Sequence, residues 1–467
     1  MLRRGPLLLL IACLGVAANA TAVAEERSRV IVLTDIGNEP DDSESMVRFL
    51  LYANEFDVEA LIATTSTWQR TVVHPELIEE RVRAYGKVLD NLRAHAPGYP
   101  DMQELLSKIR SGRPAYGLTA VGAGKDTAAS DWIIKVVDRQ DPRPVWITIW
   151  GGAVDLAQAL HTVRRTRSPA AVKAFAAKLR VYSISDQDDA GPWIRRNFPD
   201  LFWIASIHAF GAYANATWPG ISGESLMGFE GPDPALVSRE WAATKIQRGP
   251  LGLLYPSWQY LMEGDTPSFL YLIPNGLGDP EHPEYGSWGG RYDKVTVDDG
   301  LYADTLDTVT GAGGKRIRSS KATIWRWREA YQNDFTARMQ WTLDADRAKA
   351  NHPPEVVVNG SAERAPLRVI IQAGMELRLD ASGTRDPDGQ ALQFHWSSYA
   401  ETSRGAAAAV PLNLEAPDAA ILRFTVPPLR ESGQYQLVLE VRDAGEPALF
   451  RYRRVIVDVL PSVSSSR

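Results

Sequence analysis

Three aspartates and a glutamate lie in one short segment, where residues 35–42 read D-I-G-N-E-P-D-D. The apolar run before it, residues 29–34, predicts a buried strand. Residues 43–54 predict a helix, because their apolar side chains recur at helical spacing. Ligands of open α/β sheets bind at the carboxyl ends of strands, which is where this turn would lie. Clustered carboxylates repel one another unless a cation or protons offset their charge, and oxygen ligands at this density suit Ca²⁺.

The alternative to a metal site is a helix cap. Asp41 or Asp42 could accept the free backbone N–H groups at the start of the predicted helix. A cap needs only one aspartate, and it leaves Asp35 at the end of the strand unexplained. The sequence therefore favours a calcium site, with a cap as the rival interpretation.

The elements that would position this turn alternate between strand and helix. Apolar runs at 58–65, 145–150, 179–185 and 201–205 predict strands, and 74–94, 154–163, 193–197 and 321–343 predict helices. Largely apolar strands that alternate with helices indicate an α/β fold, with a mostly parallel sheet covered by helices on both faces. Residues 211–314 are rich in Gly, Pro, Trp and Tyr, and such long loops are usually functional.

Residues 30–54 resemble the N-terminal calcium motif of nucleoside hydrolases, D-x-D-x-G-x-D-D. The matched positions are Asp35, Gly37, Asp41 and Asp42, while Leu33 replaces the first aspartate and two residues are inserted before Asp41. Residues 147–160 are similar to the family's G-P-L-T-N-L-A segment. Residues 278–280 (G-D-P) resemble its H-D-P, with glycine in place of the histidine.

The whole chain resembles most a bacterial group described as cellulose-binding proteins with a nucleoside-hydrolase-like domain. The segments that carry this resemblance are 34–42, 185–199 and 286–292. The resemblance implies calcium bound by Asp35, Asp42, Asp279 and the main-chain carbonyl of Val154. It also implies Asp35 as the general base that activates water, and Asp41 as a ligand of sugar hydroxyls.

Three further residues are candidates for substrate binding. Gln187 and Asp188 follow another predicted strand end and could hold sugar hydroxyls, or they could form a solvated turn that caps the next helix. Trp288 stands among glycines that leave room for a sugar to stack on its ring. The alternative for Trp288 is a core position in an irregular loop.

The last part of the chain, residues 351–461, predicts an all-β, immunoglobulin-like sandwich. Alternating strands are separated by turn signals, among them D-P-D-G at 386–389. Carbohydrate binding is one expectation for this domain, and Trp396 is either its core tryptophan or a sugar platform. Residues 351–354 look like a linker, so the nucleoside-hydrolase-like domain at 25–350 is expected to be soluble alone.

The N-terminus has the pattern of a secretory signal, with Arg3 and Arg4 before an apolar run and A-x-A sites that predict cleavage after Ala24. A lipobox-like sequence ending at Cys13 offers lipid anchoring as the alternative. The apolar run is too short to span a bilayer. The chain has 467 residues, one cysteine and a net charge of −6, which argues against a nucleic-acid partner.

Two functions are therefore expected. The first is an exported, periplasmic or extracellular, calcium-dependent hydrolase of glycosyl bonds that acts on a carbohydrate or glycan, with insoluble polysaccharide as a further expected binding partner. The second is a non-catalytic cellulose- or polysaccharide-binding protein on the same scaffold. Leu33 and Gly278 favour the second, because both stand where the family keeps functional side chains.

Overall fold

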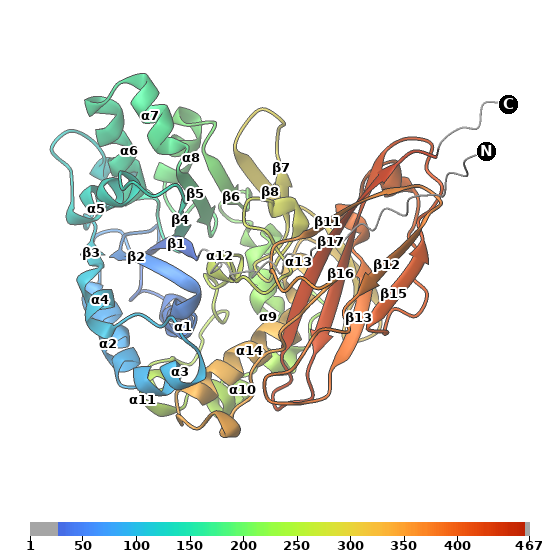
Figure 1. Cartoon of the computed structure of the whole chain (residues 1–467). Helices are drawn as coiled ribbons and strands as arrows, with labels where there is room; N and C mark the ends of the chain where they lie inside the picture. The colour runs from blue at the N-terminus through green and yellow to red at the C-terminus, as the bar shows by residue number, and fades with distance from the viewer. Residues whose placement is uncertain (1–26, 463–467) are drawn as a thin grey trace, which may run out of the picture.

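The structure is a computed structural model that describes residues 27–462. The predicted signal peptide at 1–24, with Cys13, lies outside these residues. The chain forms an α/β domain and then a β domain, and the two pack side by side (Figure 1). No helix in the described part of the chain is long and apolar enough to cross a membrane.

An eight-stranded sheet forms the centre of the α/β domain, with strand order β3-β2-β1-β4-β5-β6-β8-β7. Neighbouring strands are parallel except β7 and β8, which are antiparallel. The expected mostly parallel sheet is thus confirmed, and three strands are added to those predicted. The strands are β1 (Ser28–Thr34), β2 (Phe56–Ala63), β3 (Ile109–Ser111), β4 (Val145–Ile149), β5 (Leu179–Ser183), β6 (Phe202–Ala205), β7 (Tyr292–Lys294) and β8 (Leu301–Asp304).

Helices cover both faces of this sheet because β1 is apolar on both sides. Val30 and Val32 pack in the same cluster as Phe49 of α1, whereas Ile31 packs with Leu156 of α6 in a second cluster. The predicted helix at 74–94 is two helices, α2 and α3. The helices of the first half are α1 (Pro40–Leu51), α2 (Pro75–Gly86), α3 (Leu89–His95), α4 (Met102–Ser107), α5 (Ala128–Val137), α6 (Val154–Thr166), α7 (Pro169–Ala176) and α8 (Ala190–Asn197).

The segment after β6 is built from short elements, as its composition suggests. It ends in α13 and α14, which divide the single helix predicted at 321–343. Its elements, besides β7 and β8, are α9 (Glu224–Met227), α10 (Arg239–Trp241), α11 (Gly249–Gly252), α12 (Pro267–Leu270), the hairpin of β9 (Asp307–Thr310) and β10 (Arg316–Ser319), α13 (Ala322–Trp325) and α14 (Arg328–Trp341).

The β domain consists of two small sheets over one core. One sheet has the order β11-β17-β16-β13, with β14 also paired to β16, and the other is the pair β12-β15. Trp396 is buried in the core between them, so it is not a sugar platform. The strands are β11 (Leu367–Gln372), β12 (Glu376–Asp380), β13 (Gln393–Ser398), β14 (Arg404–Gly405), β15 (Ile421–Thr425), β16 (Gly433–Arg442) and β17 (Phe450–Leu460).

The interface between the domains is a continuation of the α/β core. Tyr452 and Phe450 of β17 belong to the same hydrophobic cluster as α1. The backbone N–H of Tyr452 donates to the carbonyl of Asn275 at 2.9 Å, so β17 also binds the α/β domain through its main chain. Asn351, in the expected linker, is buried and donates to Asp443 at 2.9 Å. This linker is therefore a packed segment, which argues against the expected independence of residues 25–350.

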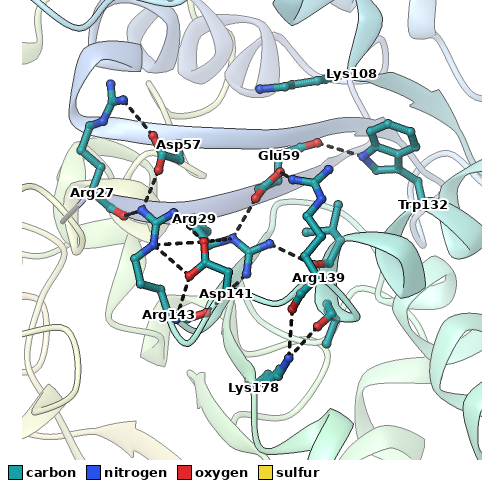
Figure 2. A network of polar contacts seen from close by, with 12 residues as sticks. Arg27, Arg29, Asp57, Glu59, Lys108, Trp132, Arg139, Asp141, Arg143 and Lys178 are labelled. Carbon is teal, nitrogen blue, oxygen red and sulfur yellow. Dashed lines mark hydrogen bonds and ion pairs between the residues drawn. The ribbon is translucent and has the colours of Figure 1, made fainter.

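The amino ends of β1 and β2 are tied together by ion pairs (Figure 2). The guanidinium of Arg29 lies 2.8 Å from Glu59, and Arg143 pairs with Asp57 at 2.6 Å and with Asp141 at 2.7 Å. Each of these carboxylates has an arginine partner. This edge thus differs from the turn at 35–42, where Asp35, Asp41 and Asp42 form no ion pair with the described residues.

Candidate functional site

The turn at 35–42 joins the carboxyl end of β1 to α1, as the sequence predicts. Asp41 and Asp42 lie in the first turn of α1, but the N-cap residue is Glu39, which makes no side-chain capping bond. The hydroxyl of Thr34 donates to Asp42 and accepts from the backbone N–H of Ile36 at 3.1 Å. Oδ1 of Asp41 accepts the backbone N–H of Asp42 at 3.0 Å, so Asp41 does bind one free N–H group of the helix start, but this leaves Asp35 and Asp42 unexplained.

A fourth aspartate, absent from the predicted set, completes the cluster. Asp41, Asp42 and Asp265 each place a carboxylate oxygen within 4.8 Å of the others. No second group of this kind occurs among residues 27–462. Asp265 is buried just before α12 and lines the same pocket as Asp35. A calcium set drawn from this edge therefore contains Asp265.

The segment that carries Asp265 is held by α1. The carboxylate of Glu44 accepts the backbone N–H of Glu263 at 2.8 Å, and the Glu263 carboxylate lies 2.6 Å from the guanidinium of Arg48. The hydroxyl of Thr266 donates to Ser45 at 3.0 Å. Glu263 adopts a positive φ of 56°, a conformation that such surrounding contacts must stabilise. These contacts bring Asp265 to the helix start, more than 200 residues from Asp42 along the chain.

The carboxylates destabilise one another in the protein alone. Burial, together with the charges of Glu39 and Asp35, raises the pKa of Asp41 to about 7. Burial likewise raises the pKa of Asp42 well above its usual value, as do Asp35 and Asp41. Burial also raises the pKa of Asp265 well above its usual value, and the charge of Asp42 is the next largest cause. Such a site favours protons or a cation as its occupant.

The donors present fit calcium. They are carboxylate oxygens, the hard ligands that Ca²⁺ prefers over nitrogen or sulfur. Oδ2 of Asp265 is buried and has no hydrogen-bond partner, which leaves it free as a ligand. Asp41, Asp42 and Asp265 would hold the ion.

Asp35 is bound differently from this group. Its Oδ2 accepts from the hydroxyl of Ser66 at 2.5 Å, and its carbonyl accepts from the amide of Gln69 at 3.0 Å. Its Oδ1 lies against Gly151, where a Cβ atom would come within 2.6 Å. Glycine is thus required at 151, and Asp35 is held in one orientation at the pocket.

Two of the expected substrate and metal residues lie in adjacent loops. The amide of Gln187 donates to the carbonyl of Trp150, and both residues line the pocket. Oδ1 of Asp188 accepts the backbone N–H groups of Ala190 and Gly191, at 2.9 and 3.3 Å. Gln187 therefore lies at the pocket, whereas Asp188 binds the first turn of α8 as the capping alternative has it, but it is buried and not solvated.

Two expected site residues lie elsewhere, and a third begins a helix that follows the carboxyl end of β4. Asp279 lines a cavity with Arg27 and Ser28, at the amino end of β1 and thus at the opposite edge of the sheet. The indole of Trp288 is fully buried and donates to the hydroxyl of Tyr452 at 3.4 Å, so it is a core residue of the interface. Val154 is the first residue of α6, where a carbonyl points along the helix away from its N-terminal end.

The pocket itself is small and faces solvent beside the carboxylates. Its volume is about 180 Å³. Pockets for drug-sized ligands measure roughly 300–1,000 Å³, so this one suits a single sugar-sized ring. Its lining joins acids to large apolar side chains: Asp35, Asn38, Glu39, Asp41, Asp42, Trp68, Trp150, Ile184, Gln187, Tyr213, Trp218, Leu226, Met227, Tyr260, Leu261 and Asp265.

Two family models match the chain. The model described as "Cellulose-binding Sde182, nucleoside hydrolase-like domain" matches residues 29–292. The model described as "Cellulose-binding protein Sde0182, C-terminal domain" matches residues 376–459. No curated protein matches.

Among solved structures, a nucleoside hydrolase-related hypothetical protein from Saccharophagus degradans, described as associated with carbohydrate metabolism, is 36% identical. The match covers 93% of this chain and 100% of that one, with a TM-score of 0.79. A PKD domain from KIAA 1837 protein is 18% identical over 25% of this chain and 97% of that one, with a TM-score of 0.18. The type III effector XopQ, complexed with adenosine diphosphate ribose, is 11% identical over 69% and 94%, with a TM-score of 0.24. The last two scores are too low to carry an argument.

Proposed function

Because the chain belongs to the family of cellulose-binding proteins with a nucleoside hydrolase-like domain, we propose that it is an exported protein that binds a glycan and hydrolyses a glycosyl bond with calcium. One observation carries the proposal. Asp35 lies in a sugar-sized pocket beside Asp41, Asp42 and Asp265, three carboxylates that suit a calcium ion.

Calcium bound at these three residues would supply electrostatic stabilisation and help to orient water. Asp35 takes a proton from the water that attacks the anomeric carbon, as the bond to the leaving group breaks with its electron pair. The transition state resembles an oxocarbenium ion, and its positive charge is stabilised by the surrounding acids. Gln187 and Glu39 lie in the pocket lining, where they can orient sugar hydroxyls.

The alternative is a glycan-binding protein without catalysis. It is favoured by Leu33, which is buried in the core and supplies no ligand where the resembled motif has an aspartate. Gly278 no longer supports this alternative, because its neighbour Asp279 lies at the opposite edge of the sheet.

The two functions are separated by a turnover screen. The purified chain is incubated with nucleosides and neutral glycans, once with calcium and once with chelator. Release of a reducing sugar or a free base with calcium alone supports the hydrolase. Binding of glycan without release of product under either condition would replace it with the binding protein.

A further inference from the structure

Three aromatic side chains form a shelf at the mouth of the carboxylate pocket. This aromatic shelf consists of Trp68, Phe210 and Tyr213. The ring centroids of Trp68 lie 5.9 Å from those of Phe210 and 6.3 Å from those of Tyr213. Trp68 is 47% exposed and Phe210 62% exposed. Large exposed aromatic groups that border a pocket indicate a binding surface.

The shelf is fixed in relation to Asp35. The backbone N–H of Trp68 donates at 2.9 Å to the hydroxyl of Ser66, the same hydroxyl that donates to Asp35. Tyr213 packs edge-on against Trp218, 6.0 Å away, and the indole N–H of Trp218 donates to Ser185 at 2.8 Å. A ligand on the shelf would therefore lie at a set position relative to the proposed base.

Ser185 ties the other side of the shelf together. It adopts a positive φ of 58°, which is uncommon for a serine. Its hydroxyl also lies 2.7 Å from Nε2 of His208, and the His208 ring packs 4.7 Å from Tyr213. Backbone strain at such a position is retained where the surrounding contacts require it. The shelf is thus an ordered part of the site, tied to strand ends on both sides.

The geometry of the shelf indicates which ligand it suits. A planar ring held between two others needs centroids about 7 Å apart, twice the optimal contact distance of roughly 3.5 Å. Trp68 and Phe210 are closer than that, so they offer outer faces and no slot for a nucleobase. A sugar ring can lay its C–H face on such an open aromatic surface.

The negative charge of the pocket further limits the classes of ligand that it can bind. Asp35, Glu39, Asp41 and Asp265 line the pocket, so anionic sugars and phosphates are repelled more than neutral ones. The pocket volume suits one ring, so any further ring of the ligand must lie outside it. The shelf adjoins the pocket through Trp68 and Tyr213, which both line it, and so offers a surface to that next ring.

We propose that the aromatic shelf is a subsite for the second sugar of a neutral glycan whose first sugar occupies the carboxylate pocket. This rests on the proposed function, because it takes a glycosyl substrate in that pocket. It adds the substrate class: a chain of at least two neutral sugars, in place of a nucleoside.

Calorimetric titration of the calcium-loaded full chain tests the proposal. The probes are cellohexaose, mannohexaose and xylohexaose, their monosaccharides, hexagalacturonate and adenosine. We expect a neutral hexasaccharide to bind more tightly than its monosaccharide and than hexagalacturonate. Trp68→Ala and Phe210→Ala should each weaken hexasaccharide binding about five- to thirtyfold, and Phe210→Ala, which lies outside the pocket lining, should leave monosaccharide binding unchanged.

Two further variants serve as controls. Trp68→Phe keeps an aromatic face and should retain most of the affinity. Trp193→Ala removes a partly buried indole on α8, outside the pocket lining, and should bind as the parent does. Because Trp68 and Phe210 are largely exposed, their alanine variants should melt at the parent temperature.

The proposal is overturned if no neutral hexasaccharide binds, if the alanine variants bind it as the parent does, or if they lose affinity for adenosine instead. Binding without turnover would contradict the proposed hydrolase and still support the shelf as a subsite. Turnover of a neutral glycan that is unchanged in Trp68→Ala would contradict the subsite and still support the hydrolase.

Discussion

Asp35 and the three clustered aspartates differ in how their oxygens are occupied. Asp35 has one oxygen bound to Ser66 and the other packed against Gly151, whereas Asp265 has a buried oxygen without a partner. A carboxylate held in one orientation by a neutral hydroxyl suits a proton acceptor. A buried carboxylate oxygen without a partner suits an ion. We therefore propose that Asp35 acts as the base and that other residues ligate the ion.

Replacing the proposed base should affect turnover more than binding. Asp35→Asn keeps the side-chain size and removes the basic carboxylate. We expect kcat to fall by roughly 10²–10⁴-fold, which is typical for general-base catalysis, with a smaller change in KM. The rates are measured on whichever substrate the turnover screen identifies. Near-parental kcat would exclude Asp35 as the base.

Replacing Asp265 should weaken calcium binding, whereas replacing Asp279 should not change it. Calcium that binds only the folded state adds RT ln(1 + [L]/Kd), about 2.7 kcal/mol at a hundredfold excess over Kd. Chelator should thus lower the Tm of the parent, and calcium should restore it. Asp265→Asn should shrink this calcium-dependent shift, and Asp279→Asn should keep it. If Asp279→Asn shrinks the calcium-dependent shift and Asp265→Asn keeps it, the ligand set expected from the sequence is correct.

The difference between Asp279 and Asp265 shows which residues of the site can be predicted from the sequence. Asp35, Asp41 and Asp42 are predictable because one turn places them together. Asp265 depends on buried contacts with α1 from a distant segment, and no local pattern encodes them. The available signal was Asp265-Thr266-Pro267, which differs by one inserted residue from the Asp-Pro pair found at 279–280.

At the scale of elements, α1 acts as the support of the site through a buried ion pair. Arg48 and Glu263 are both fully buried, and Arg48 also donates to Gln332 at 2.9 Å and to the carbonyl of Tyr331 at 2.6 Å. Removing one partner of such a pair leaves the other charge uncompensated.

Glu263→Gln should therefore destabilise the protein by about 3–5 kcal/mol and weaken calcium binding, because the segment with Asp265 loosens. Urea unfolding and a calcium titration monitored by Tm measure the two effects. Glu230→Gln is the matched control, since Glu230 forms an exposed pair with Lys315. It should leave both measurements unchanged, and an equal loss in the two variants would contradict this role of α1.

Elements with a strong local pattern were predictable from sequence, and those that depend on distant contacts were not. The strands from β1 to β6 that carry long apolar runs follow from their composition. β7 and β8 are short and half-exposed or polar, and only their pairing with each other and with β6 makes them strands. The glycines around Trp288 allow either a sugar platform or a core position, and the structure shows the core position: Gly289 approaches the backbone of Pro267 too closely for any Cβ atom. These glycines allow close packing of the loop.

At the scale of the whole molecule, the two domains share their core, so the α/β domain should not fold alone. A fragment of residues 27–350 lacks Phe450 and Tyr452, and it would expose the buried face of α14. We expect it to be insoluble or to bind a hydrophobic dye without a cooperative thermal transition. Coexpression with residues 351–462 should restore a soluble complex. A cooperative transition of the fragment alone at the Tm of the full chain would contradict this.

The interface should also lose stability in acid. Burial tends to raise the pKa of Asp334 on α14, but Arg451 and Arg338 outweigh it and hold the pKa at about 2. A lowered folded-state pKa stabilises the protein above the unfolded pKa of roughly 3.9. This contribution, roughly 2–3 kcal/mol, is lost as the pH falls from about 4 to 2.

Urea unfolding between pH 2 and 6 measures this effect. The parent should be more stable than Asp334→Asn at pH 6, and the gap should narrow over the acid window. Asp418→Asn, at an exposed aspartate of the β domain, is the control and should show no such narrowing. A gap that is independent of pH would show that Asp334 does not titrate as described.

The contribution of β17 to the α/β core also sets an order of events during synthesis. Every element of the α/β domain leaves the ribosome before Phe450 and Tyr452 do. The core of the first domain therefore stays incomplete until β17, about a hundred residues further along the chain, has been synthesised. If the predicted signal directs the chain to a translocation channel, this delay keeps the nascent chain in the unfolded state that threads through such a channel. Folding would then be completed on the far side of the membrane, when β17 packs against the α/β domain.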